Sequence, residues 1–310
     1  MIISPILYSA INEFPIMALV AIGFYISFRF LKFPDLTIDA AYMFGMTSVG
    51  MIILNFSSNI FLALILSIFF GSLVGATTGV IYSKRGGKIL AGMLVAFASY
   101  SICYRMLGRT ASLSLFNSKD SLSLFNTENY ILLVNILIVI LVYLVVVQVA
   151  KTPFGYAMKA SGSNPAILRV IGKKPNVITI FGLAFSNSIV AIGGWLNAIT
   201  NTSVQLSNFA MIINALAAVL LGEFILLLLS FFIPSLDAKN LSLHILLLIP
   251  LIGAFFYTVL KSGVLYFLSG ELKVAITTDF QLVLSVVIIA LIVFTSKIKE
   301  EKGVKSDDAF

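Results

Sequence analysis

Long apolar runs alternate with short polar interruptions along most of the 310-residue chain. The hydrocarbon core of a bilayer is about 30 Å thick, so a helix that crosses it needs about 20 mostly apolar residues. With that length, the pattern predicts nine spans, at residues 15–30, 36–54, 60–82, 89–106, 129–150, 177–199, 209–233, 242–267 and 279–296. We therefore expect an all-α, polytopic membrane protein with about nine transmembrane helices. Residues 1–296 would form a single transmembrane domain, and residues 297–310 a charged tail.

The composition supports this class. Hydrophobic residues make up 60% of the chain and charged residues only 11%, and the mean hydropathy is +1.08. A soluble globular domain contains about 25% charged residues, so that class is excluded. The first apolar run follows Glu13 instead of a basic segment, and no small-residue cleavage pattern follows it. We expect this run to be retained as a span, not removed as a signal peptide.

The positions of lysine and arginine predict the orientation. With the amino end outside and the carboxyl end in the cytoplasm, the outer side carries five of the twenty basic residues, and the inner side carries the other fifteen. The five outer residues are Arg105, Arg109, Lys119, Lys261 and Lys273. Cytoplasmic loops are enriched in lysine and arginine, which favours this topology. The net charge of +7 is explained in the same way, so no nucleic-acid partner is expected.

The most informative polar interruption is the segment 151–176, which this topology places in the cytoplasm. Asn164 followed by Pro165 is typical of a helix start, and Gly172 stands where a left-handed residue ends a helix. The signals predict a helix at Pro165–Ile171. It carries apolar residues beside a cationic set, Arg169, Lys173 and Lys174. A helix this short is unstable alone in water, so we expect a partner protein to hold it.

Motifs of soluble enzymes are absent from the sequence. It contains no phosphate-binding loop and no H-E-x-x-H pair, and His244 is its only histidine. The single cysteine, Cys103, excludes an internal disulfide and suggests no cysteine-based metal site. We therefore expect a protein that is not an enzyme and binds no metal or cofactor.

Few ionisable residues fall inside the predicted spans, and such residues are functional candidates because charge is costly in hydrocarbon. They are Asp39, Glu223 and Lys261. Asp35 would cap the second span near the cytoplasmic interface, with Asp39 one turn deeper, and capping is favoured over substrate contact. Glu223 follows Gly222 in an apolar run. This combination suggests a helix break or a polar lining, and a structural role and a role in a transport path both remain open.

Other signals concern packing and the outer surface. Gly71, Gly75 and Gly79 form two overlapping G-x-x-x-G steps, for which packing within the chain is favoured over a dimer seam. Trp195 is expected to be an interfacial anchor. A polar outer mouth would include Asn197, Asn201, Gln205 and Asn208. The outer loop 108–128 contains SLSLFN twice, which suggests a small hairpin or a plug.

Four segments carry a family resemblance. They are KFPDLTIDAAYMFG (Lys32–Gly45), AGMLVAFASYSICYRMLGR (Ala91–Arg109), GYAMKASGSNPAILRVIG (Gly155–Gly172) and ALAAVLLGE (Ala215–Glu223). Together they resemble ABC-importer permeases related to the branched-chain amino acid permeases, in particular the tryptophan or aromatic amino-acid branch. The resemblance implies that 155–172 is the loop that docks on an ATPase subunit. Gly155, Lys159, Ala160, Asn164 and Gly172 would occupy its motif positions, with lysine where arginine is usual. Pro165 and Arg169 complete the candidate coupling residues of this loop.

The same resemblance implies the assembly. It would be a homodimer in a bacterial cytoplasmic membrane, with two cytoplasmic ATP-binding subunits and an extracytoplasmic substrate-binding protein. The candidate translocation path includes Asp39, Asn197 and Glu223. The expected solute is an amino acid, plausibly aromatic, and a nucleoside, sugar or vitamin is the alternative. An ion-coupled secondary transporter is the alternative of another class, which the sparse intramembrane charges and the lack of a convincing inverted repeat disfavour.

Overall fold

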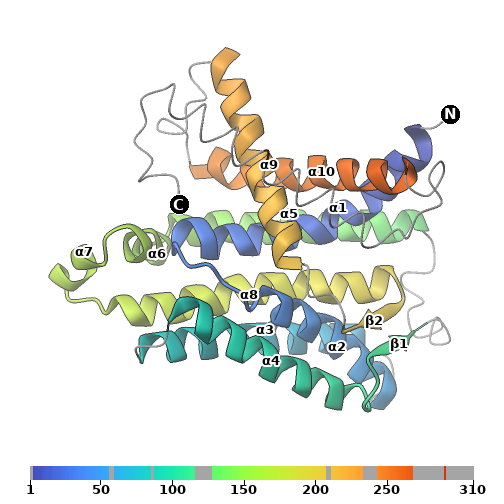
Figure 1. Ribbon diagram of the computed structural model, residues 1–310, viewed down its shortest axis with the longest axis horizontal. Coiled ribbons are helices and arrows are strands. Elements are labelled where there is room, and N and C mark those ends of the chain that lie inside the picture. Colours follow the sequence, from blue (N-terminus) through green and yellow to red (C-terminus); the bar gives the residue numbers. More distant parts are fainter. Residues whose placement is uncertain are drawn as a thin grey trace. The chain divides into compact units, whose positions relative to one another are not determined.

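The computed structural model describes residues 3–55, 59–84, 87–115, 128–206, 211–232, 243–267 and 290, and almost all of them are helical (Figure 1). The helices are α1 (Ile3–Tyr25), a π-helix η1 (Ile26–Phe30), α2 (Ile38–Asn55), α3 (Ile60–Ser83), α4 (Lys88–Met106), α5 (Glu128–Lys151), α6 (Pro153–Ser163), α7 (Pro165–Val170), α8 (Pro175–Thr200), α9 (Met211–Phe232) and α10 (Leu243–Phe267). Two short strands, β1 (Ser112–Ser114) and β2 (Ser203–Gln205), complete the described elements.

Seven of these helices are long and apolar enough to cross a bilayer. They are Pro5–Phe30, Ile60–Ser83, Lys88–Met106, Ile131–Lys151, Pro175–Thr200, Met211–Ser230 and His244–Tyr266, and Ile38–Leu54 is a shorter apolar helix. The protein is therefore a polytopic helical membrane protein. Apart from residue 290, the ninth predicted span, 279–296, and the tail 297–310 lie outside the described residues.

The described residues divide into two compact units. One comprises Ala18–Ile213, and the other comprises Met1–Met17 with Asn214–Phe310. In the first unit, α8 packs against both α2 and α3 along its length (Figure 1). Its inward residues are almost completely buried, which makes α8 the central helix of that unit.

Glycine allows α3 and α8 to approach closely. A Cβ on Gly71 would lie 2.7 Å from the carbonyl oxygen of Asn187, and one on Gly79 would lie 2.7 Å from the Cα of Ile180. At Gly75 a Cβ would overlap the backbone of Leu183. The three glycines of the G-x-x-x-G steps thus face a helix of the same chain, where only hydrogen fits between the backbones.

In the second unit, α9 and α10 make a similar approach. A Cβ on Gly222 would overlap the carbonyl of Ile249, and a Cβ on Gly253 would overlap the carbonyl of Ala218. Helix α9 continues through Gly222 without interruption. Of the two interpretations of Gly222–Glu223, the helix break is therefore excluded, and Gly222 allows close packing against α10.

The structure moves the start of two predicted spans. The first helix begins at Ile3, well before residue 15, because Pro15 is accommodated within it. The second begins at Ile38, so Asp35 is not its N-cap. Asp35 instead lies in the connection from Leu31 to Thr37, where its Oδ1 accepts a hydrogen bond from the amide of Thr37 at 2.9 Å.

The first three residues of the first SLSLFN copy form β1, which pairs with β2. The pairing is antiparallel, with Leu113 opposite Val204. It connects the loop after α4 to the loop after α8. The second copy, 121–126, lies outside the described residues.

Candidate functional site

The segment 151–176 contains two consecutive helices, α6 and α7, of which the sequence pattern predicted only the second. Helix α6 begins after Thr152, whose hydroxyl accepts a hydrogen bond from the amide of Gly155 at 3.4 Å, and Pro153 occupies its first position. A side chain on Gly155 would collide with the backbone of Ala150, 2.5 Å from its carbonyl oxygen. Gly155 thus permits the sharp turn between α5 and α6.

Helix α7 has a defined cap at each end. At the start, the Oδ1 of Asn164 accepts a hydrogen bond from the amide of Ala166 at 3.1 Å. At the end, Gly172 has φ of +74°, and two backbone bonds close the helix. The amide of Gly172 donates to the carbonyl oxygen of Arg169 at 3.0 Å. The amide of Lys173 donates to the carbonyl oxygen of Leu168 at 2.8 Å. This pair of bonds is a Schellman motif.

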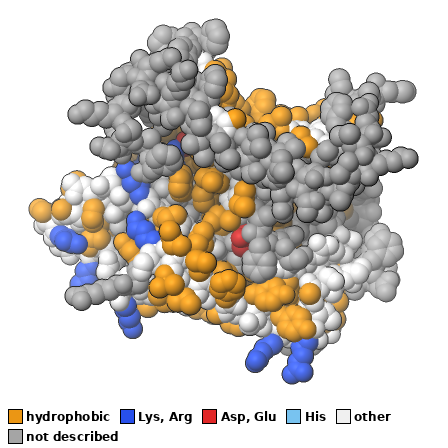
Figure 2. Space-filling view, viewed as in Figure 1, with side chains coloured by type: hydrophobic (Ala, Val, Ile, Leu, Met, Phe, Trp, Pro, Cys, Tyr) orange, Lys and Arg blue, Asp and Glu red, His pale blue; other side chains and the backbone are white. Residues whose placement is uncertain are grey.

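Leu168 packs α7 against the rest of the chain, and the other large apolar residues of this helix face outward. Leu168 is 1% exposed, whereas Val170 is 86% exposed. Ile167 and Ile171 are also more than half exposed. Figure 2 shows lysine and arginine side chains at the end of the molecule that carries this helix. The result is an anchored, rigidly capped helix that presents apolar side chains among cations.

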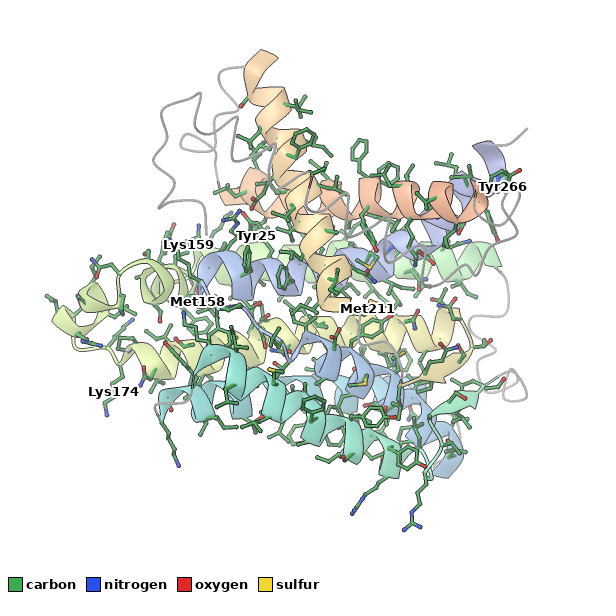
Figure 3. The ribbon with its side chains drawn as sticks, viewed as in Figure 1. Tyr25, Met158, Lys159, Lys174, Met211 and Tyr266 are labelled. Carbon is green, nitrogen blue, oxygen red and sulfur yellow. The ribbon has the colours of Figure 1, made fainter. Side chains whose placement is uncertain are left out.

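Helix α6 packs on η1, at the end of the first span. A Cβ on Gly162 would overlap the carbonyl of Phe30, so the two backbones touch. The Nζ of Lys159 lies 4.6 Å from the ring centroid of Phe30, within the range of a cation–π contact (Figure 3). Partial burial lowers the pKa of the Lys159 ammonium from its ordinary value. Helix α6 is therefore in direct contact with the end of the first span.

A buried polar cluster, which the sequence reasoning missed, joins the connection before α2 to α8. The Nδ2 of Asn187 donates to the Oδ2 of Asp35 at 2.6 Å, and the Thr37 hydroxyl donates to Oδ1 of the same carboxylate. All three side chains are completely buried. Buried carboxylates need such donors, so Asp35 is held in place by the fold. An asparagine inside the apolar run 177–199 was the available signal.

The candidate path residue Asp39 contacts a helix end. It is 6% exposed, and its Oδ1 accepts a hydrogen bond from the amide of Ile212 at 3.0 Å, in the first turn of α9. A carboxylate is favourable at the amino end of a helix. Asp39 therefore lies in the first turn of α2, as predicted, and accepts a hydrogen bond from the first turn of α9.

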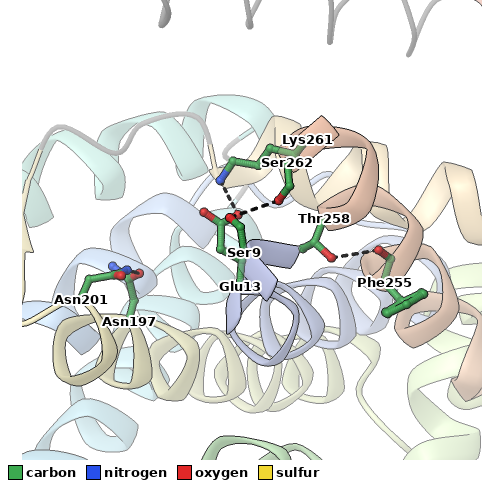
Figure 4. Close-up of polar contacts among 8 residues, drawn as sticks. All are labelled: Ser9, Glu13, Asn197, Asn201, Phe255, Thr258, Lys261 and Ser262. Carbon is green, nitrogen blue, oxygen red and sulfur yellow. Dashed lines mark hydrogen bonds and ion pairs between the residues drawn. The ribbon is translucent and has the colours of Figure 1, made fainter. Parts of the chain in front are cut away.

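Asn197 lies farther along the α2–α8 pair. Its Nδ2 is 3.3 Å from the sulfur of Met46, and its Oδ1 accepts from Asn201 at 2.6 Å (Figure 4). Met46 follows Asp39 by seven residues, about 10 Å along a helix. The structure thus puts Asp39 and Asn197 on the same helix pair, about two turns apart.

Glu223 lies in α9 at intermediate exposure. The third intramembrane candidate, Lys261, forms an ion pair with Glu13, with 2.7 Å between Nζ and Oε2 (Figure 4). The sequence analysis placed Glu13 before the first span, but in the structure Glu13 lies within α1. The pairing explains how both charges are tolerated within long apolar helices.

Trp195 is not an interfacial anchor. It is 3% exposed, and its indole N–H donates to the carbonyl of Ile60 at 3.3 Å.

Of the predicted polar mouth, Gln205 is exposed on β2, and Asn208 lies outside the described residues. Within the described ranges, no three histidine, cysteine, aspartate or glutamate residues gather in a way that could hold a metal ion.

Comparison with known proteins gives the family. Residues 6–295 match the family described as branched-chain amino acid transport system / permease component. Because the match covers nearly the whole chain, the protein belongs to this family of multi-pass membrane permeases. The resemblance seen in the sequence is thereby confirmed.

Two relatives and one solved structure are similar to the chain. A tyrosine transport system permease protein of Clostridioides difficile (strain R20291) is 28% identical over 196 residues, which is 61% of this chain and 63% of that protein. The matched part therefore spans less than two thirds of that relative. An uncharacterized protein of Rickettsia prowazekii (strain Madrid E) is 26% identical, covering 72% of this chain and 78% of that protein. The structure of PsaBC from Streptococcus pneumoniae in complex with Fab shares the fold, with a TM-score of 0.51 at 12% identity over 94% of this chain and 91% of that one.

Proposed function

We propose that this chain is the membrane-spanning permease subunit of an ATP-binding cassette importer. The observation that carries the proposal is the α6–α7 pair. Helix α7 is fixed by Leu168 and by both caps, yet it exposes 86% of Val170. An apolar side chain held outward on a rigid helix fits a hydrophobic groove on another protein. The chain has no phosphate-binding loop of its own, so the ATP-hydrolysing subunit would be that partner.

The assembly follows from this role. Two copies of the chain would form the path, with Asp39, Asn197 and Glu223 as candidate lining residues. Each copy would bind one cytoplasmic ATP-binding subunit through Gly155, Lys159, Ala160, Asn164, Pro165, Arg169 and Gly172. An extracytoplasmic binding protein would deliver the solute on the other side. The location would be the cytoplasmic membrane of a bacterium, with the amino end outside.

The proposed solute is an amino acid, plausibly an aromatic one. The tyrosine transport permease of Clostridioides difficile supports this class. The spans contain many aromatic and small residues and few charges, which suits a small zwitterion better than a metal ion or a polyanion. Nucleosides, sugars and vitamins are the competing solutes.

The test is recovery of the ATP-binding subunit with the purified permease. Replacing Val170 with aspartate would put a charge into the hydrophobic groove, whereas Val170→Leu keeps the side chain apolar. Burying a valine contributes about 1.5 kcal/mol or more, so recovery should fall at least tenfold in Val170→Asp and stay near normal in Val170→Leu. Equal recovery of the subunit from both variants would contradict docking through α7. Uptake that follows an ion gradient without ATP would favour a secondary transporter.

A further inference from the structure

A cationic pocket lies where α7 joins α8. It has a volume of about 430 Å³ and is lined by Arg169, Gly172, Lys173, Lys174, Pro175, Asn176 and Val177. Its three charged side chains are all basic and exposed. No aspartate or glutamate occurs anywhere between Glu128 and Glu223. The pocket therefore has no acidic neighbour in the adjoining sequence, and its chemistry favours an anion.

A separate apolar groove lies farther along the same face of α8. It has a volume of about 500 Å³ and is lined by Ile68, Ser72, Phe154, Phe181, Ala184, Phe185 and Ser188. Val177 of the cationic pocket and Phe181 of the groove are four residues apart, so they are neighbours on one helix face. Both are exposed, Phe181 to 61%. Figure 3 labels Lys174 at the end of α8 where the cationic pocket begins.

The groove contains no free hydrogen-bonding side chain. The hydroxyl of Ser72 donates to the carbonyl of Phe69 at 2.8 Å, and that of Ser188 donates to the carbonyl of Phe185 at 2.7 Å. Both serines are therefore satisfied within their own helices. The surface that they offer to an occupant is small and effectively apolar, which suits a hydrocarbon chain.

The dimensions match one leaflet of a bilayer. Lys174 and Ser188 are fourteen residues apart, about 21 Å along the helix. Half of the hydrocarbon core is about 15 Å, and the headgroup region lies beyond it. If α8 crosses the bilayer, the cationic pocket at its end would stand at headgroup depth, and the groove farther along the helix would extend to acyl-chain depth.

We propose that Arg169, Lys173 and Lys174 bind the phosphate of an anionic phospholipid whose acyl chain lies in the groove formed by α3, α6 and α8. Basic pockets beside membrane helices recognise anionic headgroups in this way. A soluble protein partner could reach the cations but not a groove at acyl-chain depth, so the lipid is the favoured occupant. The inference requires that α8 spans the membrane. Arg169 also belongs to the proposed ATPase-docking loop, so the test changes only Lys173 and Lys174, which do not.

The test uses the purified protein with phosphatidylglycerol or phosphatidylcholine, and native mass spectrometry to measure the lipid retained. The headgroup variant is Lys173→Gln with Lys174→Gln. Its control is Lys84→Gln with Lys151→Gln, which removes two exposed cations outside the pocket. Each cation near an anionic surface is worth about a fivefold change in binding. Affinity for phosphatidylglycerol should therefore fall roughly 25-fold in the headgroup variant and remain unchanged in the control.

Two further arms separate the possible ligands. Ala184→Phe, which fills the groove, should weaken binding of phosphatidylglycerol but leave binding of glycerol phosphate unchanged. Glycerol phosphate or inorganic phosphate at millimolar concentration should displace little lipid. Equal retention of both lipids, or no effect of the headgroup variant, would overturn the proposal. Full displacement by phosphate would show an anion site without a lipid. If the headgroup variant lost only the ATP-binding subunit, the cations would belong to protein docking instead.

Discussion

The end of α7 offers the sharpest test of how a local backbone conformation controls the docking surface. Gly172 has φ of +74°, and a Cβ built on it would meet no atom within 4 Å. A substitution there would therefore cause no steric clash with the rest of the fold. Whatever effect it has must come from the backbone conformation, which only glycine and, less easily, asparagine adopt without strain.

The magnitude follows from that conformation. A residue with a Cβ in the left-handed region costs about 1–2 kcal/mol, and a β-branched residue lies at the upper end. We expect Gly172→Val to weaken the closing bonds to Arg169 and Leu168 by about that amount. Because 1.4 kcal/mol corresponds to a tenfold change in an equilibrium, the equilibrium constant for the intact helix end should fall about 5- to 30-fold. In Gly172→Asn the population of the intact helix end should fall much less.

Hydrogen exchange of the peptide covering 164–174, followed by mass spectrometry, measures the loss directly and needs no partner. Exchange should be faster in Gly172→Val than in Gly172→Asn. Less of the ATP-binding subunit should be recovered with Gly172→Val than with Gly172→Asn. Membrane insertion should be normal in both. Indistinguishable exchange in the two variants would refute the role assigned to the left-handed end of α7.

Three other predictions concern topology, packing and substrate. In a Cys103→Ser background, single cysteines at Ser118 and Ser163 should react with an impermeant thiol reagent from opposite sides of the membrane, and labelling of both from outside would overturn the orientation. Gly75→Ala should destabilise the protein by about 1–3 kcal/mol, because its Cβ overlaps the backbone of α8. Gly263→Ala, in open space within α10, should be neutral or stabilising by about 0.5–1 kcal/mol, and denaturation in detergent compares the two. Calorimetric screening of the cognate binding protein should show tight binding of an amino acid. Tight binding of a sugar or nucleoside alone would remove the substrate proposal.

The parts of the fold that the sequence predicts are those set by local rules. Apolar run length marks the spans because the bilayer imposes a minimum length on them. Asn164, Pro165 and Gly172 mark α7 because caps act within one turn. Helix α6 was missed, although Thr152 and Pro153 form a start signal of the same kind as Asn164 and Pro165.

The interactions that the sequence does not predict join distant residues. Asp35 pairs with Asn187, 152 positions away, and Lys261 with Glu13, 248 positions away. No periodicity encodes such partners, since they depend on which helices become neighbours. Trp195 shows the same limit, because its position near a span end favours an interfacial role while the fold buries it.

The contact between α3 and α8 has a mechanical consequence. Gly71, Gly75 and Gly79 bring α3 so close to α8 that a Cβ at any of the three would lie within 3 Å of an α8 atom, so this contact has little free volume. We therefore expect α3 and α8 to move together as one unit in any conformational change of the protein, with relative movement along other helix contacts.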